Sequence, residues 1–254
     1  MKILSNRASP VSPVGLAKEL VVALFDVLGF EDRLGRFSLE EIHGQYKELI
    51  SIASTKGSHA FYDARPVGDG TSVPFFGYVE IEQDYFSDTI LLWTRFRPGT
   101  ITPFLHICSH LMCETLKAEL PLRGAISLGN AIMDKSTRTY IGPPLVEASR
   151  AEKAQQWIGL CFGHSFTTRN DVPFRADLAR PYDKHLKHGF TDVAAELVVD
   201  WPRTWRNENK SNAVPVLERL SLSGKVPEYY RCTIELVNHS DANPEWWKSY
   251  QPKP

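Results

Sequence analysis

The sequence has few cysteines, and none of them has the spacing of a disulfide framework or of a zinc motif. Four cysteines occur in 254 residues, without a CxxC pair among them: Cys108, Cys113, Cys161 and Cys232. A small secreted fold held together by disulfides is therefore excluded. We expect free thiols, as in the reducing cytoplasm.

Long apolar runs are also missing. No segment approaches the roughly 20 consecutive apolar residues that cross a bilayer, and the start MKILSNRASPVSPVG has no long apolar core. We therefore expect a soluble protein that is not exported and not inserted in a membrane. An excess of one charge is absent too, since 29 Lys and Arg face 30 Asp and Glu, a formal net charge of -1. Binding to nucleic acid or to an anionic membrane is not expected without a basic field.

The composition itself is that of an ordinary globular protein, with 43% hydrophobic and 23% charged residues. The length suits one domain that buries a proper core. Residues 1–17 are polar and contain two prolines, which predicts a flexible arm. Residues 18–254 are expected to form a single domain, with a motif-bearing core over about 21–160 and a C-terminal extension over about 161–254.

Hydrophobic periodicity in the core predicts an alternation of strands and helices. The run VVALF is typical of a buried strand, and the following FSLEEIHGQYKELISIAS has helical spacing after a cap at Ser38. Residues 56–74 carry a loop pattern, and FFGYVEIEQDYFSDTILLWTRF predicts two strands that meet at Ser87 and Asp88. A helix is predicted from Pro103 to about Glu119, and then a strand at LPLRGAISLGNAIMD.

A further strand near TYIG leads into the predicted helix LVEASRAEKAQQW. The order β-α-β-β-α-β is that of the split βαβ, or ferredoxin-like, arrangement, an α+β fold with an antiparallel sheet and both helices on one face. In the extension, the segments FTDVAAELVVDW and EYYRCTIELVN are interpreted as two more strands.

Asp26 ends the first predicted strand, where a carboxylate is costly to bury unless a cation or a hydrogen-bond donor lies beside it. The split βαβ order would bring Asp88, at the hairpin, to the same end of the sheet. Two aspartates with oxygen-only ligation suit Mg²⁺ or Mn²⁺, and pairs of such ions commonly activate an attacking oxygen and neutralise a phosphate. The alternative stays open that Asp26 caps a helix and that Asp88 is a turn residue.

Four motifs occur in a fixed order, namely DVLGF, FSD, LRGAISLG and IGPPLVEASR. Together they resemble the catalytic domain of the class III nucleotidyl cyclases, over about residues 21–152. The resemblance implies that Asp26 and Asp88 hold two Mn²⁺ or Mg²⁺ ions per site, with the backbone carbonyl of Val27. It implies that Arg123 contacts the triphosphate and that Arg150 stabilises the charge that develops on the attacked phosphorus. Since family members are head-to-tail dimers with shared sites, Arg150 would serve the partner's aspartates.

Departures from the family pattern bear on the substrate. The two base-reading positions carry Asp84 and Thr139, which match neither the adenylyl nor the guanylyl cyclases, and Val146 replaces the asparagine that orients the ribose. In these respects the chain is most similar to the bacterial Pycsar pyrimidine cyclases of anti-phage defence, which make cyclic UMP or cyclic CMP for a separately encoded effector. Tyr46 on the first helix could narrow the base pocket, although a half-buried helix tyrosine is the plainer interpretation.

The sequence therefore predicts a homodimeric cytoplasmic cyclase that acts on a pyrimidine nucleoside triphosphate. UTP is slightly favoured over CTP, because Asp84 can accept a hydrogen bond from the N3–H of uracil. A cytidylate cyclase and a catalytically silent nucleotide sensor are the alternatives. A polymerase-like palm is disfavoured by the near-zero charge. The helical spacing of His106, His110 and Cys113 would permit zinc, but no fourth ligand lies nearby in the sequence.

Overall fold

The structure is a computed structural model that describes residues 16–56, 60–66, 72–169, 172, 178–187, 197–222 and 226–246. Strand β1 (Lys18–Val27) is an inner strand of the main sheet. β1 pairs antiparallel with β5 (Thr89–Arg95) on one side and with β6 (Leu122–Asp134) on the other. β4 (Glu82–Phe86) pairs antiparallel with β5 at the edge. The resulting order β4-β5-β1-β6 is the order that the split βαβ arrangement requires.

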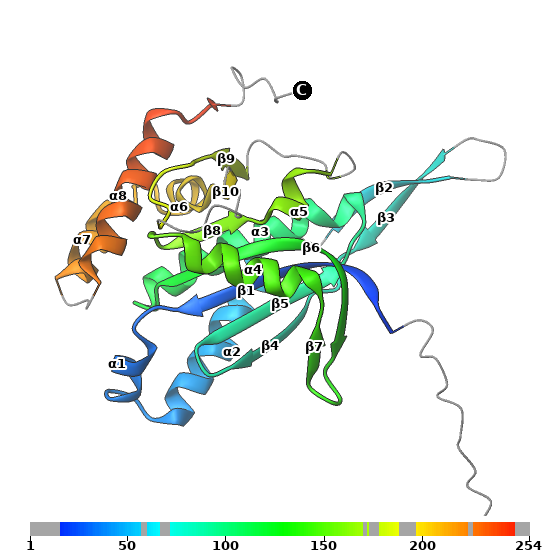
Figure 1. Ribbon diagram of the computed structural model, residues 1–254. Coiled ribbons are helices and arrows are strands. Elements are labelled where there is room, and N and C mark those ends of the chain that lie inside the picture. The colour runs from blue at the N-terminus through cyan, green and yellow to red at the C-terminus, as the bar shows by residue number, and fades with distance from the viewer. Residues whose placement is uncertain are drawn as a thin grey trace, which may run out of the picture.

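Two helices cover one face of these strands, as predicted (Figure 1). They are α2 (Leu39–Lys56) and α3 (Pro98–Lys117). Every second residue of β1 is buried with them, namely Val21, Ala23, Phe25 and Val27, because side chains alternate between the faces of a strand. Ser38 caps α2 as expected, since the Glu41 N–H donates to Ser38 Oγ at 3.2 Å.

The opposite face carries α4 (Pro143–Ala154), which packs on β6 and β1 (Figure 1). The strand β8 (Gly159–Phe162) follows α4 and pairs parallel with β6. The prediction of a purely antiparallel sheet is therefore wrong, because β6, α4 and β8 form a crossover that returns in the same direction. The short β7 (Thr139–Ile141) pairs with the end of β6, where TYIG predicted a strand.

Two predicted boundaries need correction. The expected loop over 56–74 contains most of the hairpin of β2 (Ala60–Pro66) and β3 (Ser72–Tyr78), with 57–59 and 67–71 outside the described residues. The third helix, α3, begins at Pro98 and not at Pro103, because Arg97 and Thr100 cap it through a 3.2 Å bond from the Arg97 N–H to Thr100 Oγ1. The predicted arm falls almost wholly on residues 1–15, outside the described residues.

The extension adds strands to the same sheet and helices to both of its faces. β10 (Leu197–Val199) pairs with β8, and β9 (Ala179–Pro181) pairs with β10. Of the predicted strand FTDVAAELVVDW, only Leu197–Val199 is seen as a strand, since residues 188–196 lie outside the described residues. The helices are α5 (His164–Thr167), α6 (Trp201–Asn209), α7 (Val214–Ser221) and α8 (Pro227–Ala242).

The interpretation of EYYRCTIELVN as a strand is wrong, because the segment forms most of α8. Its buried residues include Tyr230, Thr233, Val237 and Ser240, whose spacing of three or four is that of one helix face. Pro227 stands in the first turn, where the missing N–H costs nothing. The aromatic and β-branched residues that favoured a strand are buried by tertiary packing, which overrides local propensity.

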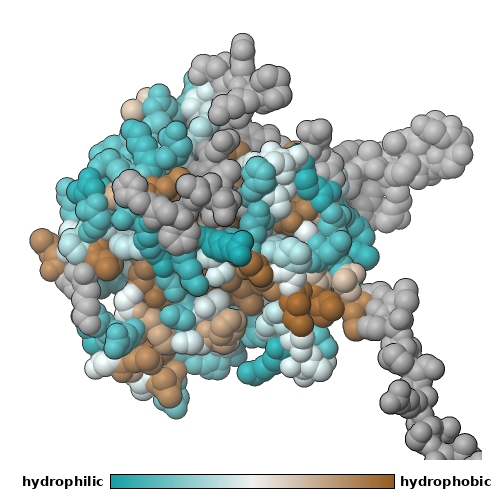
Figure 2. Space-filling model, viewed as in Figure 1, coloured by the Kyte–Doolittle hydropathy of each residue, from teal (hydrophilic) through white to brown (hydrophobic). Residues whose placement is uncertain are grey.

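The remaining features concern the surface and the thiols. All four cysteines are free and buried. Apolar side chains are exposed over β7 and around α1 (Phe30–Leu34), where Ile141 and Leu34 are 61% and 45% exposed (Figure 2). Among the described residues, no helix has the length and apolar character needed to cross a membrane.

Candidate active site

The two aspartates that the sequence singles out lie at the same end of the sheet. Asp26 is the penultimate residue of β1 and pairs with Thr89, the first residue of β5, while Asp88 lies in the turn before that strand. The Val27 N–H donates to the backbone oxygen of Asp88 at 2.9 Å, which fixes the turn against the end of β1. Asp26, Val27 and Asp88 line one cavity of about 770 Å³.

The two aspartates of this cavity repel one another. Burial raises the pKa of Asp26 above its ordinary value, and although Arg123 acts in the opposite direction, the charge of Asp88 raises the pKa further. Burial also raises the pKa of Tyr46, helped by the charges of Asp88 and Asp26. A cation between the two carboxylates would relieve their repulsion, so the donor set fits a hard divalent ion.

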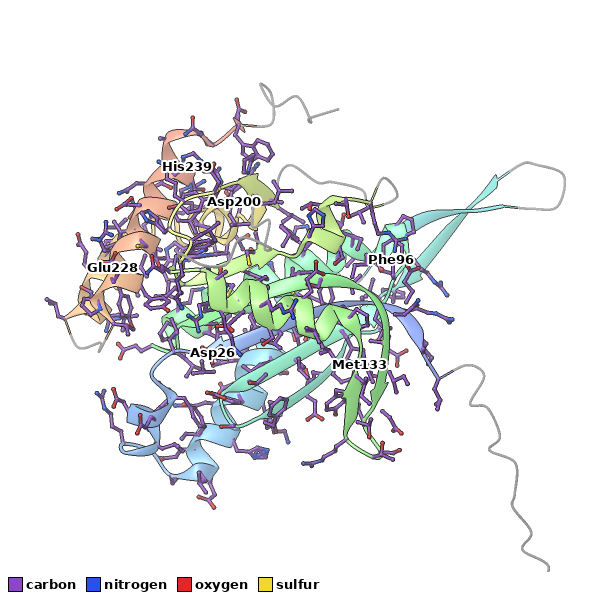
Figure 3. The ribbon with its side chains drawn as sticks, viewed as in Figure 1. Asp26, Phe96, Met133, Asp200, Glu228 and His239 are labelled. Atoms are coloured by element: carbon purple, nitrogen blue, oxygen red, sulfur yellow. The ribbon has the colours of Figure 1, made fainter. Side chains whose placement is uncertain are left out.

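Arg123 is held directly beside Asp26. The two residues are opposite one another in the pairing of β6 with β1, and Arg123 Nη2 lies 3.1 Å from Asp26 Oδ2 (Figure 3 labels Asp26). The same Nη2 contacts the carboxylate of Glu152 on α4, and Nη1 donates to the hydroxyl of Tyr229 on α8 at 2.6 Å. Arg123, predicted to contact a triphosphate, is thus already engaged by three side chains and is 9% exposed.

Sequence reasoning missed two members of this cluster. Glu152 is 3% exposed, and burial raises its pKa although Arg123 attracts its charged form. Its sequence signal was its position two residues after Arg150, in the same motif helix. Tyr229 had no usable signal, because its segment reads as a strand and its partner is 106 positions away.

A second cavity, of about 430 Å³, lies along the same face of the sheet and is lined by Leu24, Asp84, Tyr85, Phe86, Leu91, Arg138, Tyr140 and Leu145. Leu24 pairs with Leu91, which pairs with Asp84, and Asp26 lies two residues further along β1. Asp84 and Asp26 therefore project from the same face, in rows about 7 Å apart. The Tyr140 hydroxyl donates to Asp84, and burial together with this bond raises the pKa of Tyr140 to about 12.

The other predicted residues are less central. Thr139 accepts a 2.9 Å hydrogen bond from Thr137 Oγ1 and does not line the second cavity. Tyr46 is 2% exposed, packs its ring against Phe30 and Tyr85, and lines neither cavity.

The residues of α4 that the motif IGPPLVEASR singles out face outward. Arg150 is exposed on this helix, and Val146 is 54% exposed. The buried face of α4 is made instead by Glu152 and by small residues, among them Ala148 and Ala151. Arg150 of the same chain is therefore displayed at the surface.

Within the described part of the chain, no group of three or more His, Cys, Asp or Glu is placed to hold a metal ion. Asp26 and Asp88 supply two carboxylates, so further ligands would be carbonyl, water or phosphate oxygens, as is usual for Mg²⁺. No family model matches the chain, and no curated protein matches it.

Proposed function

We propose that the chain is a nucleotidyl cyclase that converts a pyrimidine nucleoside triphosphate, UTP in the first place, into the 3′,5′-cyclic nucleotide and pyrophosphate. The observation that carries the proposal is the pair Asp26 and Asp88, fixed at one end of the sheet and lining a single cavity of about 770 Å³. That volume is in the range of small-molecule sites. Burial and the charge of Asp88 raise the pKa of Asp26, and a cation bound between the two carboxylates would offset both effects.

The chain's residues would divide the work as follows. Asp26, Asp88 and the carbonyl of Val27 would hold two Mn²⁺ or Mg²⁺ ions, which when bound lower the pKa of the ribose 3′-hydroxyl and neutralise phosphate charge. Arg123 keeps the Asp26 carboxylate oriented and adds positive charge at the site. Catalysis would then rest on positioning and electrostatics, without a nucleophilic side chain.

The proposal includes a head-to-tail homodimer in which Arg150 serves the partner's aspartates. Arg150 is exposed on α4, which agrees with a role outside its own chain. Exposed apolar side chains accompany it on the α4 side of the sheet: Phe86 is 53% exposed, Ile141 61% and Val146 54%. We assign them to the dimer interface, because exposed apolar patches mark interaction sites.

Base recognition is assigned to the second cavity, which contains Asp84. Its carboxylate can accept a hydrogen bond from the N3–H of uracil or from the amino group of cytosine. Tyr140 already donates to Asp84 and holds it in place. A cytidylate cyclase is therefore the alternative within the same proposal.

From the resemblance of its motifs to those of the Pycsar pyrimidine cyclases, we propose that the product is a second messenger of anti-phage defence. A separately encoded effector would bind this product. The four buried free thiols support a reducing cytoplasm as the compartment.

The test is incubation of the protein with Mn²⁺ and each of the four nucleoside triphosphates, followed by mass spectrometry of the products. We expect cyclic UMP, or cyclic CMP for the alternative, and its loss in Asp26→Asn and in Asp88→Asn. Asp183→Asn is the matched control, because Asp183 is exposed and lines neither cavity. Exclusive formation of cyclic AMP or cyclic GMP would refute the pyrimidine assignment, and no cyclic product from any triphosphate would refute the cyclase.

A silent nucleotide sensor is the second candidate, and Val146 favours it. This residue replaces the ribose-orienting asparagine of the family that the chain resembles. Calorimetry that shows tight binding of a nucleoside triphosphate, without release of pyrophosphate, would support the sensor over the cyclase.

A further inference from the structure

We infer that Tyr229 is a positioning residue of the candidate active site, which makes the C-terminal helix α8 a part of that site. Tyr229 holds the guanidinium of Arg123 against Asp26. The inference rests on the proposed function for the identity of the ligand, a pyrophosphate-containing nucleotide. It assigns a role to the extension, which lies outside the four motifs.

The contacts of Arg123 show how the guanidinium is fixed. Its Nη1 donates to the Tyr229 hydroxyl at 2.6 Å, while Nη2 faces Asp26 and Glu152. The guanidinium carbon also lies 5.2 Å from the centre of the Tyr229 ring. A planar guanidinium with both terminal nitrogens engaged has little freedom to rotate. Tyr229 is the only neutral member of the cluster among the described partners of Arg123, so it orients the guanidinium without adding charge.

The helix that carries Tyr229 is itself anchored. One turn later, Thr233 Oγ1 accepts a hydrogen bond from the Ile158 N–H at 2.7 Å. Near the other end, buried Arg180 donates to the backbone oxygens of His239 at 3.2 Å and Asn243 at 3.1 Å. Figure 3 shows Asp200 and His239 at that end and Glu228 at the end nearer Asp26. The Tyr229 hydroxyl is therefore presented from a rigid element, as a precise site requires.

Removal of the hydroxyl would loosen a shared cation. Arg123 lies between two carboxylates, and Glu152 is the more deeply buried of the two, at 4% side-chain exposure against 26% for Asp26. Without the third contact, the guanidinium can turn toward Glu152 and away from Asp26. Asp26 and the positive charge beside it would then be less well placed for a metal-bound phosphate.

The variant that tests this is Tyr229→Phe, which keeps the ring and removes only the hydroxyl. Binding of pyrophosphate in the presence of Mn²⁺ is measured by calorimetry, so that the result does not depend on turnover. We expect the affinity to fall about tenfold, the worth of one hydrogen bond to a charged group. In the turnover assay, the KM for the triphosphate should rise by the same factor.

Two further variants separate positioning from stability. Ser240→Ala removes a buried hydrogen bond of the same helix, from Ser240 Oγ to Asp200 Oδ1, about 16 Å along the axis from Tyr229. It should lower the melting temperature and leave pyrophosphate affinity unchanged. Arg123→Lys removes the fork through which Tyr229 acts, so Tyr229→Phe should have no further effect in that background.

The inference would be overturned if Tyr229→Phe left the pyrophosphate affinity unchanged, or if Ser240→Ala lowered the affinity equally. Additive effects of Tyr229→Phe and Arg123→Lys on the affinity would overturn it too. A wild-type protein that binds no pyrophosphate with Mn²⁺ would overturn it as well. Failure of the proposed function gives a different result, since a wild-type protein that binds pyrophosphate but forms no cyclic nucleotide still permits the comparison of variants. In that case the calorimetry alone decides the role of Tyr229.

Discussion

Two arginine–aspartate pairs of this protein have the same chemistry and opposite surroundings. Arg180 and Asp200 are joined at 2.8 Å with both side chains 0% exposed, and Asp200 also accepts a 2.7 Å bond from Ser240. Arg123 and Asp26 are joined at 3.1 Å with 11% and 26% exposure, and Asp26 lines a cavity. Helix α8 contacts both pairs.

The difference shows how position divides structural from functional ion pairs. The terminal nitrogens of Arg180 donate to the backbone oxygens of His239, near the end of α8, and of Asn243, just beyond it, so the pair anchors the extension to the sheet. In the other pair, Asp26 has a raised pKa and lines a cavity together with a second carboxylate, Asp88. Perturbed carboxylates in a cavity are candidates for function, and satisfied buried pairs are candidates for stability.

The largest effect on stability is expected at the buried pair. Arg180→Leu leaves Asp200 buried without its cation and should lower the free energy of unfolding by about 3–5 kcal/mol. Urea denaturation followed by circular dichroism measures the change. The double variant Arg180→Leu with Asp200→Leu should recover part of the loss, because no isolated charge remains. A loss below about 1 kcal/mol in the single variant would contradict the anchoring role.

The second prediction concerns the other pair, where function and stability should separate. Asp26→Asn is expected to lower cyclase turnover by about two to three orders of magnitude, as for other groups that stabilise transition-state charge. The free energy of unfolding of this variant should change by less than about 1 kcal/mol, because the pair is partly exposed and Arg123 keeps its ion pair with Glu152. A turnover assay and urea denaturation on one preparation test both. Large destabilisation would make Asp26 a structural residue like Asp200.

The third prediction uses the pH dependence of stability. Burial raises the pKa of Glu152 above 4.5, so the folded protein keeps this proton at higher pH than the unfolded chain. Ionisation of Glu152 therefore lowers the free energy of unfolding as the pH rises from the pKa of the unfolded chain through the pKa of the folded protein. Glu152→Gln removes this cost, and the stability of the variant relative to wild type should improve as the pH rises above about 4.5.

Glu114 is the control of opposite sign. Burial acts to raise its pKa, but the hydrogen bonds and charges of Lys117 and Lys56 outweigh burial and lower it below 4.5. Its contribution to stability is present above the unfolded value and is lost as the pH falls. The free energy of unfolding of Glu114→Gln should therefore fall relative to wild type as the pH rises. If this difference from wild type changed with pH in the same direction for Glu114→Gln and Glu152→Gln, the assignment would be contradicted.

The smallest effects are expected in the second cavity. Asp84→Asn should raise the KM for the pyrimidine triphosphate about tenfold, and Tyr140→Phe about threefold, because the first loses a charged acceptor and the second only its orientation. Steady-state kinetics with UTP and CTP measures both. Glu82→Gln is the control on the same strand, since Glu82 pairs with Lys135 at 2.9 Å and lies outside this cavity. Equal effects in all three variants would remove base recognition from this cavity.

Local patterns explain why part of the fold could be predicted. The central strand VVALF, the Ser38 cap and the hairpin that turns at Ser87 all appear where expected. Each depends on residues close in sequence: a β-branched run, a serine three residues before a glutamate, and a polar pair between apolar strands. From the strand order, the proximity of Asp26 and Asp88 followed.

The errors arose where distant residues decide the local structure. The β2 and β3 hairpin lies in a segment rich in glycine and proline, whose loop signal is strong. The sequence of helix α8 reads as a strand because it contains aromatic and β-branched residues, which are common in strands. Its helical conformation is decided by the surfaces against which these residues pack. The parallel pairing of β8 depended on the crossover through α4 and not on the strand itself.

By itself, the sequence determined an α+β protein with two aspartates at one end of its central strands, because periods of 2 and 3.6 and the turn residues act over short distances. It also supplied the motifs from which a cyclase is proposed. Only the tertiary structure decided what surrounds Asp26. Glu152 and Tyr229 converge on Arg123 from two helices, and Tyr229 comes from 106 positions away. Tyr229 lies beside Arg123 because of how α8 packs, and the sequence of this helix reads as a strand.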